Sequence, residues 1–467
     1  MQAMFDRGLS LMLSVALGLA VIACVDPGQA KEAGDELGDG DTESGDGDGD
    51  SDALRPNWHQ DIAPIVYDHC VQCHREGGVA PMSLTDYEAA APWASLMLDE
   101  IDKGTMPPWG AETTDRCDPA HEFKDDPSLS TQEVALLSEW LAEGTPEGDP
   151  ADAVALPEPP NTDLVGISGT FQNSSEFTVE GPKDDYVCFS TDLGLSETKY
   201  LDGVQMLPDN DQVVHHVLVW ITETAPAGAP GPYPCFATPG GGIPINQAKL
   251  VAIWVPGSTP TQFPEGVSVE VPPGSHVVLA YHYHPPGAGT YSDQSSVALR
   301  WRDQPTEWLG EFVFLGVGPS APELITPPFM IPAGAVDHPE TIGEPWTKQD
   351  VSVFSVGSHM HYVGRDQLTA IQHAGQQPQD SDCMAHTPAW DFNWQRFYEI
   401  DLPLEQLPTL SVGDTVWMDC RYDNVIENPG VARALSEQGL SEPQDVYWGE
   451  GTLDEMCVAL LGVAWKP

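Results

Sequence analysis

The sequence predicts a mainly β protein with a small helical module near its N-terminus. Three observations support this prediction. The 467 residues include 44 glycines and 44 prolines, well above average usage, which favours many short strands joined by turns. Segments with strand-like apolar patterns recur from Val165 to the C-terminus. We find no competing helical pattern in that part of the chain, whereas a helical spacing of apolar residues ends the preceding module.

Length and charge limit the possible classes of function. A chain of this length has room for about three domains. Its 18 Lys and Arg residues against 72 Asp and Glu residues give a formal net charge of -54. Such a protein repels phosphate backbones and anionic lipid surfaces. Nucleic-acid binding is therefore excluded.

Residues 1–24 are typical of a lipoprotein signal peptide. The apolar run over residues 8–23 follows Arg7 and is too short for a membrane span. The residues up to Cys24 resemble the lipobox of bacterial lipoproteins, in which the cysteine is lipidated. We therefore expect an exported protein that is anchored to the cell envelope, on the periplasmic or outer-membrane side, through lipid on Cys24 alone. The alternative is an ordinary secretory signal with an incidental cysteine.

Residues 25–55 consist mostly of Asp, Gly, Glu and Ser. This composition has almost nothing to bury and repels itself. We expect a disordered acidic tether.

Residues 56–152 contain the motif C-x-x-C-H at Cys70, Cys73 and His74. Two thiols at this spacing can add to the vinyl groups of one haem, and the adjacent histidine supplies an axial nitrogen to the iron. The alternatives are a redox dithiol and half of a zinc site, but the sequence has no second C-x-x-C. The motif therefore favours a covalent haem c.

A sixth iron ligand is expected from a methionine further along the chain. Met82 and Met106 are the candidates, and we favour Met106 because the Pro107-Pro108 pair that follows would hold its thioether in a fixed loop. Residues 56–152 resemble small, α-helical bacterial c-type cytochrome domains, which implies electron transfer.

A Pro- and Ala-rich linker over residues 150–160 precedes the β-rich body. Eight segments of the body have strand patterns. They are residues 213–221, 249–255, 268–273, 276–284, 311–317, 351–363, 415–422 and 456–465.

Three groups of histidines lie on these segments. His359 and His361 are two residues apart, so on a strand they project from one face and can chelate one ion. His282 and His284 share a face in the same way, whereas the adjacent His215 and His216 point to opposite faces of a regular strand. If both of the last pair bind one metal, their strand must be bulged or twisted there.

The order HH, HYH, HMHxxGR and GEGTLDEMC resembles the copper type II, ascorbate-dependent monooxygenases over residues 165–467. This family includes the peptidylglycine α-hydroxylating and dopamine β-hydroxylating enzymes. The resemblance implies two antiparallel, jelly-roll-like β-sandwich domains, residues 153–335 and 336–467, with one copper ion each. It implies an electron-donating copper on His215, His216 and His282, and an oxygen-binding, catalytic copper on His359, His361 and Met456.

The residue types fit this chemistry. Imidazole suits both oxidation states of copper, while the soft thioether of Met456 favours Cu(I). The alternative for Met456 is core packing beside Cys457. For His284 we prefer a supporting or solvent-facing role.

Six cysteines remain after Cys24, Cys70 and Cys73, and an exported chain should pair many of them. The resemblance implies disulfides between Cys188 and Cys235 and between Cys420 and Cys457. Cys117 and Cys383 are left to bridge the domains or to stay free.

The implied reaction is hydroxylation of an activated C–H bond of a small molecule with O2 and two electrons from an external donor, either ascorbate-like or a redox protein. We hypothesise that the haem passes these electrons to the copper sites within the chain. The amidating branch of the family holds its carboxylate substrate with an Arg and a Tyr, but the matching positions here are Gly357 and Leu460. Peptide amidation is therefore disfavoured, and a neutral or cationic substrate is preferred.

Two other classes of function stay open. One is a haem and copper protein that only transfers electrons or binds copper at the cell surface. The other is a binding or structural protein with a degenerate site. Substrate-dependent consumption of O2 distinguishes the enzyme from both.

Overall fold

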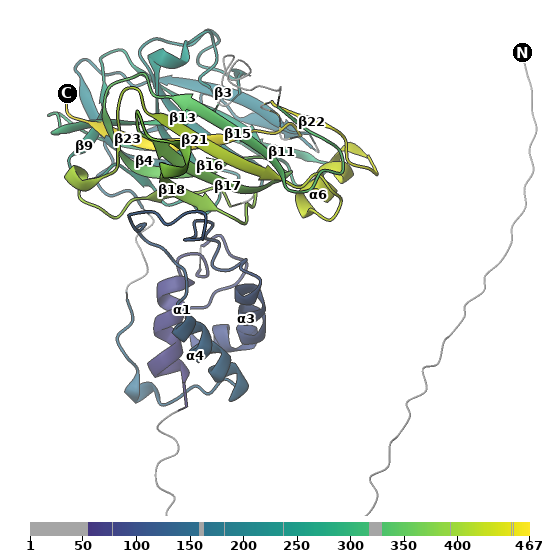
Figure 1. Ribbon diagram of the computed structural model, residues 1–467. Coiled ribbons are helices and arrows are strands. Elements are labelled where there is room, and N and C mark those ends of the chain that lie inside the picture. Colours follow the sequence, from purple (N-terminus) through teal and green to yellow (C-terminus); the bar gives the residue numbers. More distant parts are fainter. Residues whose placement is uncertain are drawn as a thin grey trace, which may run out of the picture. The chain divides into compact units, whose positions relative to one another are not determined.

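The structure is a computed structural model (Figure 1), and it describes residues 55–76, 78–157, 163–181, 183–236, 238–316, 329–392, 394–449, 451 and 453–467. The predicted signal peptide, Cys24 and all but the last residue of the tether lie outside the described residues. In the described part, no helix is long and apolar enough to cross a membrane.

The described residues from 55 to 152 form a helical part with its own hydrophobic core. Its helices are η2 (Trp58–Ile62), α1 (Ala63–His69), α2 (Tyr87–Ala90), η3 (Ala91–Trp93), α3 (Ala94–Asp102), α4 (Thr131–Ala142) and η4 (Pro150–Asp152). Helix α4 begins at a capping box in which Ser130 and Glu133 satisfy each other's backbone N–H groups. Leu137 and Trp140 share one face of α4 and are buried against Trp58.

The remaining elements are strands with a few short helices. They are β1 (Gly169–Gln172), β2 (Phe177–Glu180), β3 (Asp185–Asp192), β4 (Lys199–Leu207), β5 (Val214–Thr222), β6 (Tyr233–Pro234), η5 (Ile245–Gln247), β7 (Ala248–Trp254), β8 (Thr261–Gln262), β9 (Val267–Val271), β10 (His276–Tyr283), β11 (Thr290–Asp293), β12 (Ser296–Arg302), β13 (Trp308–Leu315), β14 (Met330–Ile331), β15 (His338–Pro345), β16 (Val351–His359), β17 (Gly364–Gln372), η6 (Pro378–Asp380), β18 (Asp382–Thr387), β19 (Phe397–Glu399), η7 (Leu404–Gln406), β20 (Thr409–Leu410), β21 (Thr415–Tyr422), α6 (Pro429–Gln438), β22 (Val446–Tyr447) and β23 (Val458–Trp465). Because strands hold 36% of the described residues and helices 16%, the prediction of a mainly β protein is confirmed. Each of the eight predicted strand segments contains a strand.

Helix α6 shows that the expectation of no helix in the body was wrong. Asn428 caps its N-terminus by accepting a hydrogen bond from the backbone N–H of Gly430, and Pro429 occupies the first turn. Gly439 ends the helix in the left-handed conformation, at φ 67°. The buried face is only Val431 and Leu435, which is too short a periodic pattern to stand out from the sequence.

One sheet connects the strands that carry the histidine groups. β10 pairs with β5, β5 with β7, and β7 with β13. β13 then pairs with β23, and β23 with β16, so the sheet continues past residue 335 without a break in pairing. A second sheet has the order β15-β21-β17-β18. The predicted domain boundaries stay a prediction.

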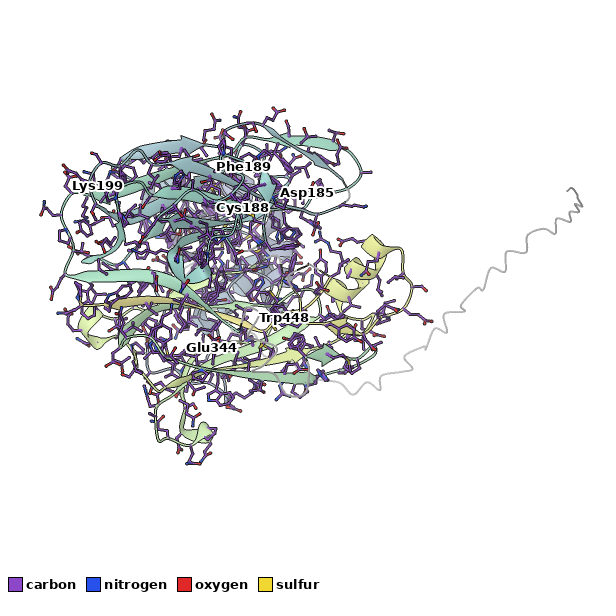
Figure 2. The ribbon with its side chains drawn as sticks, turned by 90° about the horizontal axis from the view of Figure 1, so that it is seen from above. Asp185, Cys188, Phe189, Lys199, Glu344 and Trp448 are labelled. Atoms are coloured by element: carbon purple, nitrogen blue, oxygen red, sulfur yellow. A yellow bond between two sulfur atoms is a disulfide. The ribbon has the colours of Figure 1, made fainter. Side chains whose placement is uncertain are left out.

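The hydrophobic core of the body is also continuous. The labelled side chains of Phe189 and Trp448 in Figure 2 come from strand β3 and from the segment after β22, and both belong to or pack against this one core.

The segment between α3 and α4 leaves the helical part and crosses to the body; we call residues 107–126 the strap. Cys117 in the strap forms a disulfide with Cys383 of β18, so the cysteines that the sequence left unassigned bridge the helical part and the body. The Arg116 guanidinium forms ion pairs with Asp366 and Asp419 on the second sheet, at 2.8 Å and 2.7 Å. The strap is thus held by both covalent and ionic contacts.

The other two disulfides are the pairs that the resemblance implies. Cys188 of β3 is joined to Cys235, and Cys420 of β21 is joined to Cys457 next to Met456.

Candidate functional site

His215, His216 and His282 come together where β5 pairs with β10. The pairing places His216 opposite His282 and Val214 opposite Tyr283, so His215 is the extra residue of a β-bulge. One ligand nitrogen from each of the three imidazoles lies within 4.8 Å of the others. The bulge that two adjacent ligands require is therefore present, and the three side chains can hold one metal ion.

Asp184, just before β3, orients this group. Its carboxylate accepts hydrogen bonds from His282 Nε2 at 2.9 Å and from His284 Nδ1 at 2.7 Å. Because an ionised carboxylate only accepts, His282 carries its proton on Nε2, and Nδ1 holds the lone pair that a metal needs. Tyr186 stacks on the His282 ring with centroids 4.5 Å apart. His284 thus acts on a ligand through Asp184, in the supporting role that we preferred for it.

His359 and His361 lie at the end of β16 and in the loop that follows, with ring centroids 5.1 Å apart. His359 Nδ1 donates to the amide oxygen of Gln395 at 2.7 Å, and His361 Nδ1 donates to the carbonyl of Asp454 at 3.0 Å. Each ring therefore has its Nε2 lone pair left for a metal.

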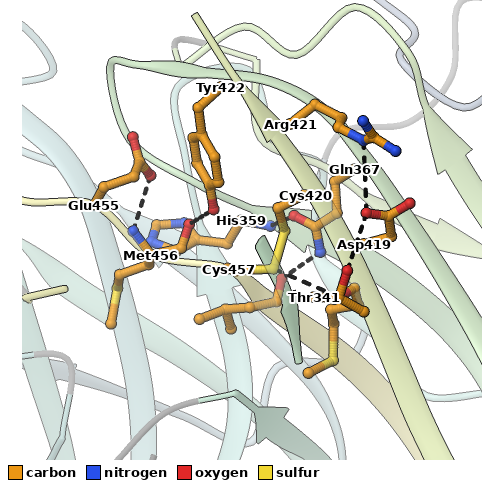
Figure 3. The surroundings of a disulfide bond; sticks show 12 residues. Thr341, His359, Gln367, Asp419, Cys420, Arg421, Tyr422, Glu455, Met456 and Cys457 are labelled. Atoms are coloured by element: carbon orange, nitrogen blue, oxygen red, sulfur yellow. Dashed lines mark hydrogen bonds and ion pairs between the residues drawn. A yellow bond between two sulfur atoms is a disulfide. The ribbon is translucent and has the colours of Figure 1, made fainter. Parts of the chain in front are cut away.

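Met456 is linked to the His359 and His361 loop through the buried carboxyl of Glu455 (Figure 3). Glu455 accepts hydrogen bonds from the backbone N–H groups of His361, of Val363 at 3.1 Å and of Met456 at 2.9 Å. The Tyr422 hydroxyl donates to the Met456 carbonyl at 2.7 Å. Together with the Cys420–Cys457 disulfide, these contacts fix the backbone that presents the thioether.

A single cavity of about 260 Å³ is lined by His216 and His282 from one group and by His359, His361 and Met456 from the other. Burial lowers the pKa values of all five imidazoles below their ordinary value, that of His361 to about 3. They stay neutral at physiological pH, which is the state that binds metals. The residues fit two metal ions with imidazole and thioether donors.

The haem motif follows directly on helix α1. His74 is buried, and its Nδ1 donates to the carbonyl of Met82 at 3.3 Å, which leaves Nε2 for an axial bond. Burial, reinforced by the nearby Cys73, raises the pKa of the Cys70 thiol to about 12, and neither cysteine is in a disulfide. These residues fit a covalent haem. Met106 as the sixth ligand stays a prediction.

The haem motif also borders the cavity of the body. Gln72, between the two motif cysteines, lines the cavity. The side chain of Val79 lies close to Gly257 in the loop between β7 and β8. A Cβ placed on Gly257 would lie 3.3 Å from it.

Several residues of the site were not predicted from the sequence. Asp184, Tyr186, Phe392, Gln395 and Glu455 all contact the candidate ligands or their backbone. Only Glu455 carried a usable signal, as an acidic residue inside the motif next to Met456. The others come from segments distant in sequence.

No family model and no curated protein matches the chain. Among solved structures, the chain is similar to the Cowpea mosaic virus top component, with 8% identity and a TM-score of 0.32 over 66% of this chain and 92% of that one. It is also similar to the major capsid protein P2 of bacteriophage PM2, with 8% identity and a TM-score of 0.26 over 61% of this chain and 98% of that one. Likeness at this level carries no argument about function.

Proposed function

We propose that this chain is a copper-dependent monooxygenase of the copper type II class, which hydroxylates an activated C–H bond of a small molecule with O2. The observation that carries the proposal is that two donor sets with different chemistry face one cavity. One set is the three imidazoles of His215, His216 and His282, of which His216 and His282 line the cavity. The other is His359, His361 and the thioether of Met456, all three of which line it. When bound there, copper would supply one-electron redox chemistry and, at the softer thioether site, the reduction of O2.

The chain's own residues prepare the cavity for this chemistry. Hydrogen bonds to Asp184, Gln395 and the Asp454 carbonyl fix the imidazole tautomers, so little reorganisation is needed on metal binding. Aromatic side chains cover much of the wall and exclude water from the reacting atoms. They are Phe236, Phe312, Phe314, Phe354, Phe392, Trp394 and Phe397.

The lining also bears on the substrate. Gly357 and Leu460 pair with each other across β16 and β23, so neither position supplies the Arg or Tyr side chain with which the amidating enzymes hold a carboxylate. Among the described lining residues, Arg396 and Glu399 are the charged ones, and Glu399 is paired with Lys124 of the strap. A small, largely apolar substrate suits this wall best.

We further propose that the helical part is the electron donor, with haem held by Cys70, Cys73 and His74. The support is the position of Gln72 on the cavity wall, because it brings the attachment motif to the edge of the donor sets. A donor in the same chain acts at a high effective concentration and does not depend on diffusion.

The test is a metal and haem analysis of the exported protein, followed by measurements of O2 consumption with candidate substrates. One haem and two copper ions per chain, with substrate-dependent O2 uptake, are expected. Met456→Ala should abolish O2 uptake while the haem spectrum and the other copper remain. Met206→Ala is the matched control, because Met206 is as buried as Met456, at 6% exposure, and lies outside the cavity.

Haem and copper without substrate-dependent O2 uptake would instead support an electron-transfer or copper-binding protein. Absence of copper from the purified protein would overturn both the monooxygenase and the copper-binding alternative.

A further inference from the structure

Helix α6 contacts His284, the histidine that supports the first donor set. His284 lies one residue beyond β10, and its Nε2 accepts a hydrogen bond from the Arg433 guanidinium of α6. Glu437, one turn further along α6, lies 3.9 Å from the same nitrogen. A helix that lies between His361 and Met456 in the sequence thus reaches a residue that supports the first donor set.

The Arg433 contact sets the direction of a hydrogen-bond relay. Arginine only donates, so His284 accepts at Nε2 and carries its proton on Nδ1. His284 Nδ1 donates a hydrogen bond to one carboxylate oxygen of Asp184, and the other oxygen of Asp184 accepts a hydrogen bond from His282 Nε2. The relay therefore connects α6 to a candidate copper ligand through two intervening side chains.

Arg433 is itself held in place by Glu437 of α6 and by Tyr362, which is next to the second donor set. Its Nε donates to Glu437 at 2.9 Å, one turn along the helix. Its guanidinium lies over the ring of Tyr362, 5.5 Å from the centroid, and Tyr362 directly follows His361. Arg433 thus reaches the first donor set through His284 and Asp184, and it lies over Tyr362 beside the second.

Phe392 fills the space between the same two sets. It is buried, and its ring is stacked on His215 with centroids 4.8 Å apart. The same ring lies 4.5 Å from Tyr362 and 6.4 Å from His361. The two donor sets are therefore connected in two ways: by the packing of Phe392 and by the hydrogen bonds that start at Arg433.

We propose that Asp184, His284, Tyr362, Arg433 and Glu437 form a clasp that holds the two donor sets at a fixed separation, with Arg433 as its positioning residue. The proposal rests on the proposed function, because it assigns a purpose to the spacing of the two metal sites. It adds that α6 controls their coupling without contacting either metal or substrate.

The experiment compares Arg433→Met with Arg302→Met. Methionine keeps the length of the side chain and removes its charge. Arg302 pairs with Asp202 on β4, away from the cavity, so its replacement controls for the loss of one surface charge. Glu437→Gln is a second variant, which removes the carboxylate that holds Arg433.

The first measurement is hydrogen exchange of the metal-free protein. In Arg433→Met, the amides of residues 281–284 and 430–438 should exchange about fivefold faster or more than in wild type, because the contacts that close these segments are gone. Glu437→Gln should shift exchange in the same direction, and Arg302→Met should leave it unchanged. Unchanged exchange in both α6 variants would overturn the proposal.

The second measurement is the magnetic dipolar broadening between two Cu(II) ions in the loaded protein. Both α6 variants should bind two copper ions, and the broadening should be weaker or spread over many separations. Equal broadening in Arg433→Met and wild type would overturn the clasp. If wild type binds no copper, the proposed function fails, and the exchange experiment still decides whether the clasp closes the two sets.

Discussion

At the scale of single residues, four of the candidate ligand histidines share one arrangement of protons. His74, His282, His359 and His361 each donate one ring N–H to an oxygen acceptor. Each ring therefore holds a defined tautomer, with one nitrogen available to a metal. A metal-binding imidazole is typically oriented by a hydrogen bond from its other ring nitrogen, so these bonds suit metal ligands.

The role of Asp184 gives a prediction about copper affinity. Asp184→Asn removes the charge that accepts from His282 and His284, and we expect the affinity of this site for Cu(I) to fall about 10- to 100-fold. Competition with a Cu(I) chelator measures the change. Asp303→Asn, at an exposed aspartate paired with Lys199, is the control. Equal affinity in the two variants would contradict the orienting role.

Glu455 gives a prediction about pH. Burial raises its pKa to about 8, against the lowering effect of the backbone N–H groups that it accepts from. The native protein then keeps a proton that the unfolded chain releases at a lower pH, so this residue's contribution to stability is lost as pH rises. Between about pH 5 and pH 8, the free energy of unfolding of metal-free wild type should fall more than that of Glu455→Gln. Parallel urea denaturation curves across this range would show the carboxyl to be ionised throughout.

At the scale of elements, strands were predictable and the contacts between distant segments were not. The segment around His282 is apolar over most of its length, and such runs predict strands without knowledge of neighbours. From the sequence, the bulge at His215 and His216 can be predicted only by assuming that both histidines bind one ion. The Asp184 carboxylate and the Phe392 ring reach the site from segments whose position depends on how the whole sheet pairs, which no local pattern encodes.

The disulfide of the strap should contribute measurably to the free energy of unfolding. Replacing both Cys117 and Cys383 by serine should lower the free energy of unfolding by about 2–4 kcal/mol, because the disulfide restricts the unfolded chain. Urea denaturation measures this loss. The ion pairs of Arg116 remain in the variant, so the haem spectrum of its native state should match wild type. A changed spectrum would mean that the strap moves when the disulfide is absent.

At the scale of the whole molecule, the attachment motif and the donor sets belong to one described unit. Rapid reduction of the haem in copper-loaded protein should be followed by reoxidation at a rate independent of protein concentration, since the electron stays within the chain. Met456→Ala, which keeps the three-imidazole set, should retain this phase, and copper-free protein should lose it. A rate that is the same with and without copper would contradict electron delivery to that set.

The pairing of β13 with β23 has a mechanical consequence. Both donor sets are attached to one continuous ladder of backbone hydrogen bonds, from β10 to β16. A motion that separates the strands carrying the two donor sets would break several of those hydrogen bonds at once. A large hinge motion between them is therefore unfavourable in free energy. If the proposed function holds, a reactant would have to reach the donor sets between side chains and rim loops, and the width of that passage, more than contacts with a charged group, would select which molecules react.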